Sequence, residues 1–297
     1  MNHCFEETKR FLKKVAPMTW ELTEPHLLYL DEKQSADYLQ VMQDQNYSQT
    51  FHNDTVGLIE NHLEELFPNQ KTEVSLIDLG PGYPDKSLPM AKFLKKRGQN
   101  VFYYPVDVSL KYLSIAEHEM FPYCERVTPI HSLFEIAHQK IPTDAYTRPV
   151  YTLIGLTFMN FPSKTILNLL TKLSGTKNSF VIFASEMISI NNPPEKIIEA
   201  YRGPAMQTFT FGPLRHLGLG EDQVIFTPIF SKQRVEIRFV IKKMINHLPI
   251  QKGDTVITAV SYRYTENEFI RLVKHYFHEY KIWYSADDKT ALVKGYL

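Results

Sequence analysis

The chain has 297 residues, 43% of them hydrophobic and 22% charged, which is typical of a globular protein with one large domain or two smaller ones. Its 33 basic and 33 acidic residues balance and no block of one sign occurs, so neither nucleic acid nor an anionic membrane is expected as a partner. A charged N-terminus, only two cysteines and no apolar run of about 20 residues favour a cytoplasmic protein without a structural disulfide. A monomer is favoured.

The first region, residues 1–70, is predicted to be helical and to pack over the functional site. Its clearest helix follows Asp54, which is expected to be the cap, and carries Val56 and Ile59 on an apolar face.

From Val74 onward, strands and helices alternate. Strands are predicted at 74–79, 101–106, 126–131, 150–156 and 179–186, and helices at about 85–97, 109–120, 133–139 and 163–174. This alternation indicates a parallel sheet with crossover helices on both faces, and ligands then bind at the carboxyl ends of the strands.

The alternation ends after Glu186. Residues 191–261 are predicted to form a smaller α+β insert, in which strands at 235–241 and 254–262 pair antiparallel. Residues 262–297 then return to the domain begun by residues 71–190. They add a helix from Thr265, with Glu268 completing a capping box, and a closing hairpin at 281–284 and 290–296. A parallel sheet with an antiparallel C-terminal hairpin is the outline of the Rossmann-like class I methyltransferase fold, an α/β architecture.

A glycine motif follows the first predicted strand. The apolar run of this strand meets an acid at Asp78, and Gly80 and Gly82 come before the next helix, where the backbone can approach a ligand closely. An ordinary strand-to-helix turn would also explain the glycines. The second strand, however, ends in Asp107, whose carboxylate can accept hydrogen bonds from both hydroxyls of a ribose. Together the two strands predict a nucleoside site.

The methyltransferase outline makes S-adenosylmethionine the expected cofactor. Methyl transfer needs positioning and exclusion of water rather than a metal, and no metal site is predicted. After the fourth strand, Asn160 lies where a ligand could bind, although it could instead cap the helix beyond Pro162. The sequence Asn191 to Pro194 is similar to a motif of some amino-methyltransferases, but it follows the fifth strand and is interpreted as a turn.

Several motifs, in shared order, make the chain similar to the histidine-specific methyltransferase family, of which the histidine Nα-methyltransferases are typical. They are Asp78 to Gly82 with Lys86, Tyr104 to Ser109, Gly155 to Asn160, Ala200–Tyr201, Val235 to Ile237 and Ser261 to Thr265.

The resemblance implies a role for each matching residue. Cofactor binding would involve the strand ends and glycine loops, namely Asp78, Gly80, Gly82, Lys86, Asp107 and Gly155. Asn160 and Tyr201 would be the catalytic pair and would hold the α-amino and carboxylate groups of an amino acid substrate. Tyr47 and Ser261 would complete the substrate site, with Ser261 near the substrate's side chain.

The chain also departs from the family. In the family, a glutamate and this serine together bind the imidazole of histidine. The position of that glutamate is occupied by Ala259 here. The acid expected near the adenine is replaced by His131–Ser132, and an N-terminal Tyr-Tyr-Pro signature is reduced to Tyr47. We therefore expect the cofactor site to be kept and the substrate to be a small amine or amino acid other than unmodified histidine.

Three alternatives stay open at this level. The methylated amine could belong to a protein or an RNA. The chain could be a nicotinamide or flavin oxidoreductase, which the terminal hairpin disfavours. It could also bind S-adenosylmethionine without turnover, which the loss of the glutamate at Ala259 keeps open.

Overall fold

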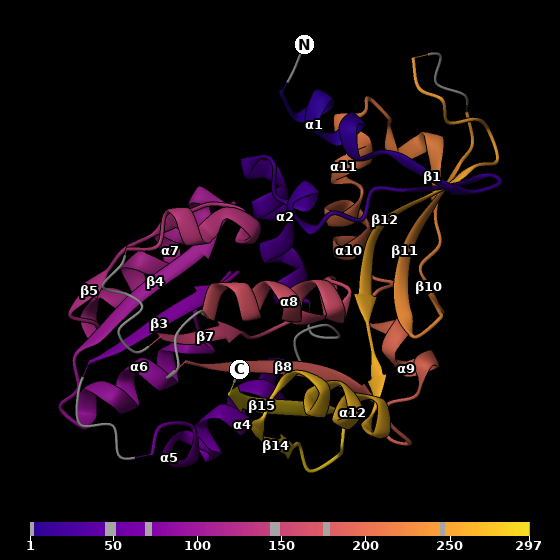
Figure 1. Ribbon diagram of the computed structural model, residues 1–297. Coiled ribbons are helices and arrows are strands. Elements are labelled where there is room, and N and C mark those ends of the chain that lie inside the picture. The colour runs from indigo at the N-terminus through magenta and orange to yellow at the C-terminus, as the bar shows by residue number, and fades with distance from the viewer. Residues whose placement is uncertain are drawn as a thin grey trace. The chain divides into compact units, whose positions relative to one another are not determined.

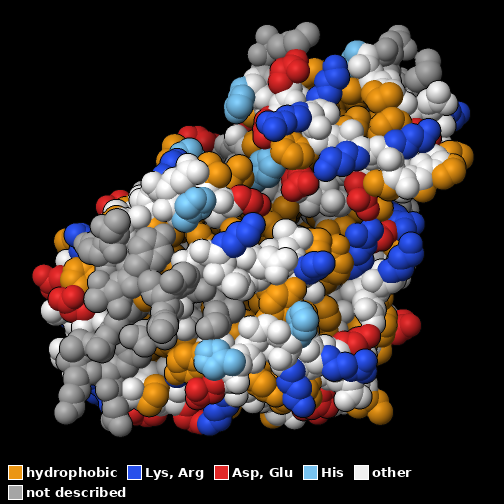
Figure 2. Space-filling model, viewed as in Figure 1, with side chains coloured by type: hydrophobic (Ala, Val, Ile, Leu, Met, Phe, Trp, Pro, Cys, Tyr) orange, Lys and Arg blue, Asp and Glu red, His pale blue; other side chains and the backbone are white. Residues whose placement is uncertain are grey.

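The computed structural model in Figure 1 describes residues 3–44, 52–68, 73–142, 149–174, 179–243 and 247–296. The chain forms two compact units: unit 1 comprises Met1–Ser48 and Pro193–Arg263, and unit 2 comprises Gln49–Asn192 and Tyr264–Leu297. Acidic and basic side chains are mixed over much of the face shown in Figure 2. Within the described ranges, every helix is too short or too polar to cross a lipid bilayer.

Unit 2 is built on a sheet whose strands follow the order β14-β15-β8-β7-β3-β4-β5, with β6 beside β4 and β13 beside β8. Its strands are β3 (Val74–Leu79), β4 (Val101–Asp107), β5 (Arg126–Val127), β6 (Ile130–His131), β7 (Pro149–Leu153), β8 (Phe180–Ile188), β13 (Tyr264–Thr265), β14 (Glu279–Tyr284) and β15 (Thr290–Tyr296). Strands β3, β4, β7 and β8 are parallel, whereas β15 is antiparallel to both β8 and β14. The predicted parallel sheet with a terminal antiparallel hairpin is confirmed.

The helices of unit 2 connect these strands in two series (Figure 1). They are α4 (Asn53–Asn61), α5 (Leu63–Leu66), α6 (Ser87–Lys96), α7 (Leu110–Met120), η3 (Phe121–Tyr123), η4 (Phe134–Gln139), η6 (Phe158–Asn160), α8 (Ser163–Ser174) and α12 (Glu266–Tyr276). From β3 the sheet grows one way through α6 and α7, and from β7 it grows the other way through α8. Right-handed crossovers place these two series on opposite faces, so the strand order reverses between β3 and β7.

Burial explains why these strands are mostly apolar. Every residue of β3 is buried, as expected for a parallel strand covered by helices on both faces. The start of α12 also follows the prediction, because the backbone N–H and the hydroxyl of Thr265 both donate to Glu268 Oε2, at 3.0 and 2.7 Å.

Three local predictions in unit 2 were wrong. The strand predicted at 126–131 is two short strands on either side of Pro129, which has no N–H to donate to a ladder. The helix predicted at 133–139 is the 3₁₀ helix η4. Asp54 lies inside the first turn of α4, whose capping position is His52.

Unit 1 contains a second sheet, with the order β1-β2-β12-β11-β10 and with β9 beside β11. Its elements are α1 (His3–Phe11), β1 (Lys13–Ala16), β2 (Thr19–Glu21), η1 (Pro25–Leu28), α2 (Glu32–Gln43), α9 (Pro194–Glu199), α10 (Pro204–Thr210), α11 (Gly212–His216), η7 (Glu221–Gln223), β9 (Val224–Phe226), β10 (Ile229–Ser231), β11 (Arg234–Ile241) and β12 (Thr255–Tyr262). The predicted antiparallel pairing of β11 and β12 is confirmed.

The N-terminal region differs from the all-helical prediction, because β1 and β2 form a hairpin there. All four residues of β1 are exposed, so the strand lacks the apolar alternation by which a sequence signals a strand. Strand β2 then pairs in parallel with β12, Thr19 lying opposite Thr255. This pairing joins the N-terminal residues to the segment that had been predicted as a separate insert.

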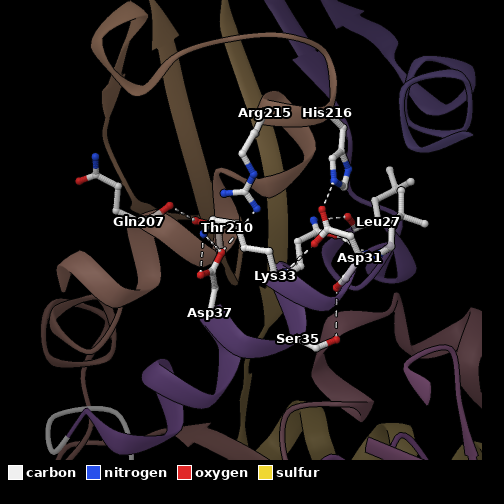
Figure 3. Close-up of polar contacts among 11 residues, drawn as sticks. Leu27, Asp31, Lys33, Ser35, Asp37, Gln207, Thr210, Arg215 and His216 are labelled. Carbon is white, nitrogen blue, oxygen red and sulfur yellow. Dashed lines mark hydrogen bonds and ion pairs between the residues drawn. The ribbon is translucent and has the colours of Figure 1, made fainter. Parts of the chain in front are cut away.

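Polar contacts hold α2 against α11 within unit 1 (Figure 3). Asp31 caps α2 by accepting a hydrogen bond from Gln34 N at 2.7 Å, and its other oxygen lies 2.7 Å from His216 Nε2. Asp37, further along α2, lies 2.8 Å from Lys33 Nζ and 3.5 Å from Arg215 Nη2. Burial opposes ionisation of Asp31, yet the bonds from His216 and Gln34 lower the pKa of its carboxyl group overall. The ionised carboxylate of Asp31 therefore helps to hold α2 in place.

Candidate functional site

The loop after β3 adopts a conformation that requires glycine. Gly80 and Gly82 have φ values of +70° and +53°. A Cβ on Gly80 would lie 3.1 Å from Thr157 Oγ1 and 3.2 Å from Phe134 Cζ, tighter than ordinary contacts. The N–H of Gly80 also donates to Val106 O at 2.9 Å, which ties the loop to β4. Two glycines, which have no Cβ, therefore lie in the loop between β3 and α6.

Asp78 lies beneath this loop rather than on its surface. Its side chain is buried and accepts hydrogen bonds from the hydroxyls of Ser87, Tyr103 and Thr152, at 2.5, 2.7 and 2.7 Å. Burial raises the pKa of Asp78, and these donors oppose that effect. Both carboxylate oxygens accept hydrogen bonds within unit 2, so Asp78 helps to hold the loop, and its contact with the cofactor stays a prediction.

Lys86 follows the glycine loop at the start of α6 and lies beside the loop after β7. The φ of Gly155 is +91°, and a Cβ there would meet Lys86 Cε at 3.6 Å. Lys86 Nζ lies 2.8 Å from Asp85 Oδ1, while Asp85 Oδ2 lies 2.9 Å from His52 Nε2. Burial alone would raise the pKa of Asp85, but the larger combined effect of His52 and Lys86 lowers it below the ordinary value. The carboxylate is therefore ionised.

Asp107 ends β4 at the same edge of the sheet. Its carboxyl is 8% exposed and accepts a hydrogen bond from Ser109 N at 2.8 Å. Burial raises the pKa of Asp107 to about 7, against the opposing effect of N–H groups from Ser109, Val108 and Gly82. His131 lies opposite Asp107 on β6, where the family's acid was expected. A carboxyl that titrates near neutrality therefore lies at the tip of the second strand.

The predicted cofactor residues consequently gather at one edge of unit 2, at the carboxyl ends of β3, β4 and β7. This edge includes the reversal of strand order between β3 and β7, which is where open α/β sheets bind ligands.

Asn160 ends η6 in the loop after β7. Its N–H donates to Leu156 O at 3.0 Å, and its half-buried amide has no hydrogen-bond partner within the described part of the chain. Helix α8 begins at Ser163, so Asn160 does not occupy its capping position. The amide is thus available to a ligand. The segment at Asn191 is the expected turn, since Ser189 and Asn192 form an isolated antiparallel bridge.

In unit 1, two of the predicted substrate residues, Tyr201 and Ser261, meet at an arginine. Arg263 is fully buried, and its Nη1 donates to Ser261 Oγ at 2.7 Å and to Tyr262 O at 2.9 Å. Its Nη2 donates to the hydroxyl of Tyr201 at 2.6 Å. We call Tyr201, Ser261 and Arg263 the Ser261 cluster. Sequence reasoning missed the role of Arg263, although its spacing of two residues from Ser261 was a usable signal, because such residues share a face of extended chain.

Ala259 lies next to Ser261 on the same face of β12. Ala259 faces Ile237 and Ser261 faces Val235 across the ladder, and directly opposite residues share a face of the sheet. Arg238 pairs with Ile257, so Thr258 has no partner on β11 and forms a bulge just before Ala259. On the other face, Glu236 accepts hydrogen bonds from Arg234 and Arg238, both at 2.8 Å.

Two predictions are not tested by this geometry. Tyr47 lies outside the described residues. Asn160 and Tyr201 belong to different units, and each is described within its own. Across the described ranges, no group of three or more His, Cys, Asp or Glu side chains is arranged to hold a metal ion.

Comparison with known proteins identifies a family for nearly the whole chain. A family model described as histidine-specific methyltransferase, SAM-dependent, matches residues 17–294. No curated protein matches the chain.

Solved structures resemble it at low identity. The citrinin polyketide synthase CMeT domain is 9% identical with a TM-score of 0.50, a match that covers 91% of this chain and 58% of that one. The glycopeptide N-methyltransferase MtfA complexed with sinefungin is 11% identical over 82% of this chain and 94% of that one, with a TM-score of 0.42. The first likeness supports the class I methyltransferase fold.

Proposed function

Since the chain belongs to the family of histidine-specific methyltransferases that depend on S-adenosylmethionine, we propose that it methylates the amino nitrogen of a small amino-acid-like substrate other than unmodified histidine. The family makes the chain a methyltransferase, and the choice of nitrogen and of substrate is our proposal. It rests on the residues gathered in each unit.

The cofactor edge of unit 2 fits S-adenosylmethionine. Gly80 lets the loop backbone pass close to Thr157 and Phe134 at the carboxyl end of β3, and Asp107, when ionised, can accept hydrogen bonds from ribose hydroxyls. Lys86, at the start of α6, supplies a positive charge suited to the cofactor's carboxylate. When bound, S-adenosylmethionine supplies a methyl group that is activated by a sulfonium.

Asn160 is the residue that we assign to the reacting amine. Its amide oxygen can accept a hydrogen bond from an amino N–H and so orient the nitrogen lone pair. The amine must be neutral to react, so transfer occurs from the fraction that has already lost its proton to water, and Asn160 then orients that neutral amine. In unit 1, the hydroxyl of Tyr201 would contact the carboxylate of the substrate, and Ser261 would contact its side chain.

The observation that carries the choice of substrate is the methyl group of Ala259 beside Ser261. A glutamate at this position would accept a hydrogen bond from the imidazole N–H, an interaction that contributes about 1.5–3 kcal/mol when one partner is charged. Without it, histidine loses a main source of recognition. The zero net charge and the mixed surface favour a small molecule over nucleic acid.

Mass spectrometry with methyl-labelled S-adenosylmethionine and a panel of amino acids and amines tests this proposal. Label on the amino nitrogen of a panel member other than histidine is the expected result. Label on histidine alone would contradict the proposed substrate, and label on carbon or oxygen would contradict the proposed reaction. Binding of cofactor without transfer to any member would favour a binding-only protein or a protein substrate.

A further inference from the structure

Arg263 fixes the direction of the hydrogen bonds in the Ser261 cluster. A guanidinium has no acceptor atom, so the contacts at 2.7 and 2.6 Å make the hydroxyl oxygens of Ser261 and Tyr201 the acceptors. The hydroxyl proton of Ser261 is then left for another atom, and within the described part of the chain it reaches none. Ser261 therefore presents a hydrogen-bond donor.

The neighbours of Ser261 on this face provide no competing acceptor. Ser261 lies opposite Val235, and Ala259 lies opposite Ile237, so three of these four side chains are aliphatic. The acidic side chain of β11, Glu236, lies opposite Val260 on the other face of the ladder and is held there by Arg234 and Arg238. The fully buried Arg263 adds a positive charge behind the hydroxyl.

We infer from this arrangement that the substrate is an amino acid whose side chain ends in a carboxylate. The inference rests on the proposed function, which places the substrate's side chain at Ser261. An oxygen acceptor completes the hydrogen bond that Ser261 offers, and a negative charge is attracted by Arg263 in surroundings of low polarity. A side chain that brings an N–H donor finds no carboxylate at Ala259 and leaves its polar atom unpaired.

Aspartate and leucine make a sharp pair of probes, because their side chains have the same branching and differ in the two terminal oxygens. Binding of aspartate, glutamate, leucine and histidine would be measured by calorimetry on the full chain saturated with S-adenosylhomocysteine, in which no transfer can occur. We expect an acidic amino acid to bind about tenfold to a hundredfold more tightly than leucine or histidine, as for a charge-assisted hydrogen bond.

Two variants show whether Ser261 is the cause. Ser261→Ala should remove most of the difference between the acidic amino acid and leucine. Thr258→Val is the matched control, because its hydroxyl lies in the adjacent bulge, is buried and has no partner within the described residues, so the difference should persist. If Ser261→Ala fails to fold, Ala259→Glu serves in its place, since a carboxylate there should repel acidic ligands and favour histidine.

The inference and the proposed function fail separately. Tight acidic binding that depends on Ser261, without transfer of labelled methyl, would leave the inference standing and overturn the function. Amino-group methylation of leucine, with acidic amino acids bound no more tightly than leucine, would support the proposed function and overturn the inference. Preference for histidine in binding, absence of binding by all four amino acids, or a preference unchanged by Ser261→Ala overturns the inference.

Discussion

Unit 2 and unit 1 differ in how closely their site residues follow the histidine-specific pattern. In unit 2, Gly80, Lys86 and Asp107 lie together at the carboxyl ends of the strands, in an arrangement that suits S-adenosylmethionine. In unit 1, Tyr201 and Ser261 match the pattern, but Ala259 removes the acid that distinguishes histidine. On the proposed assignments, the cofactor residues and the residues that distinguish substrate side chains lie in separate parts of this chain, so one set can change while the other is kept.

The largest effect is expected at Gly80. Gly80→Ala should weaken cofactor binding about a hundredfold, because the new methyl combines a left-handed backbone with contacts to Thr157 and Phe134. Gly98→Ala is the matched control: its φ is +74°, but a Cβ there has nothing within 4 Å. Both variants carry the backbone strain, of about 1–2 kcal/mol. Equilibrium dialysis with labelled S-adenosylmethionine measures the difference, and equal binding by the two would break the assignment of this loop.

Asp107 should make cofactor binding depend on pH. With its pKa near 7, the carboxylate that accepts ribose hydroxyls is mostly protonated at pH 6 and mostly ionised at pH 8. Affinity should therefore rise about tenfold between these values, and Asp107→Asn should bind weakly with a flat profile. Calorimetric titration across this range measures it.

The stability of the free protein should change with the opposite sign. The pKa of Asp107 is higher in the folded chain than in the unfolded chain, so its contribution is greatest at low pH and is lost as the pH rises through about 7. Denaturant unfolding of the wild type and of Asp107→Asn between pH 5 and 8 isolates this contribution. A wild-type curve that rises more steeply than that of the variant would contradict the assigned pKa.

In unit 1, Ala259→Glu should restore the missing acceptor. We expect kcat/KM for histidine to rise about tenfold, since a charged hydrogen bond of this kind contributes about 1.5–3 kcal/mol. Ala259→Gln controls for side-chain size and should give a smaller gain. Binding of S-adenosylmethionine should stay within a factor of about two, because Ala259 lies outside the cofactor residues. An unchanged substrate preference would count against the placement of Ala259 in the substrate site.

The smallest effect on activity is expected beneath the glycine loop. Thr152→Val removes the hydroxyl that donates to Oδ1 of the buried Asp78 and should cost about 1–3 kcal/mol of unfolding free energy, because that oxygen loses this donor. Ser87 and Tyr103 still hold the carboxylate, so cofactor affinity should change little. Urea unfolding and equilibrium dialysis measure the two quantities. A large loss of affinity without loss of stability would place Asp78 in direct contact with the cofactor.

The sequence predicted the parallel sheet well because its signals are local. Strands such as Val74–Leu79 are mostly apolar and buried along their whole length, and the glycine motif follows at a fixed place. Residues 13–21 lacked such a signal, since β1 is wholly exposed and β2 is stabilised by a partner distant in sequence. The residues proposed for the site matched family motifs, but Arg263 became visible only when its contacts with Ser261 and Tyr201 were seen.

The pairing of β2 with β12 also affects the order in which the protein can fold on the ribosome. Trp20 donates to Asp254 across a separation of 234 residues, and the sheet of unit 1 is incomplete until β12 has been synthesised. At about 5–20 residues per second, translation of this interval takes roughly 10 to 50 seconds. During that time the first parallel strands of unit 2 can already pair, whereas the nascent N-terminal strands stay without their partner and are open to chaperones.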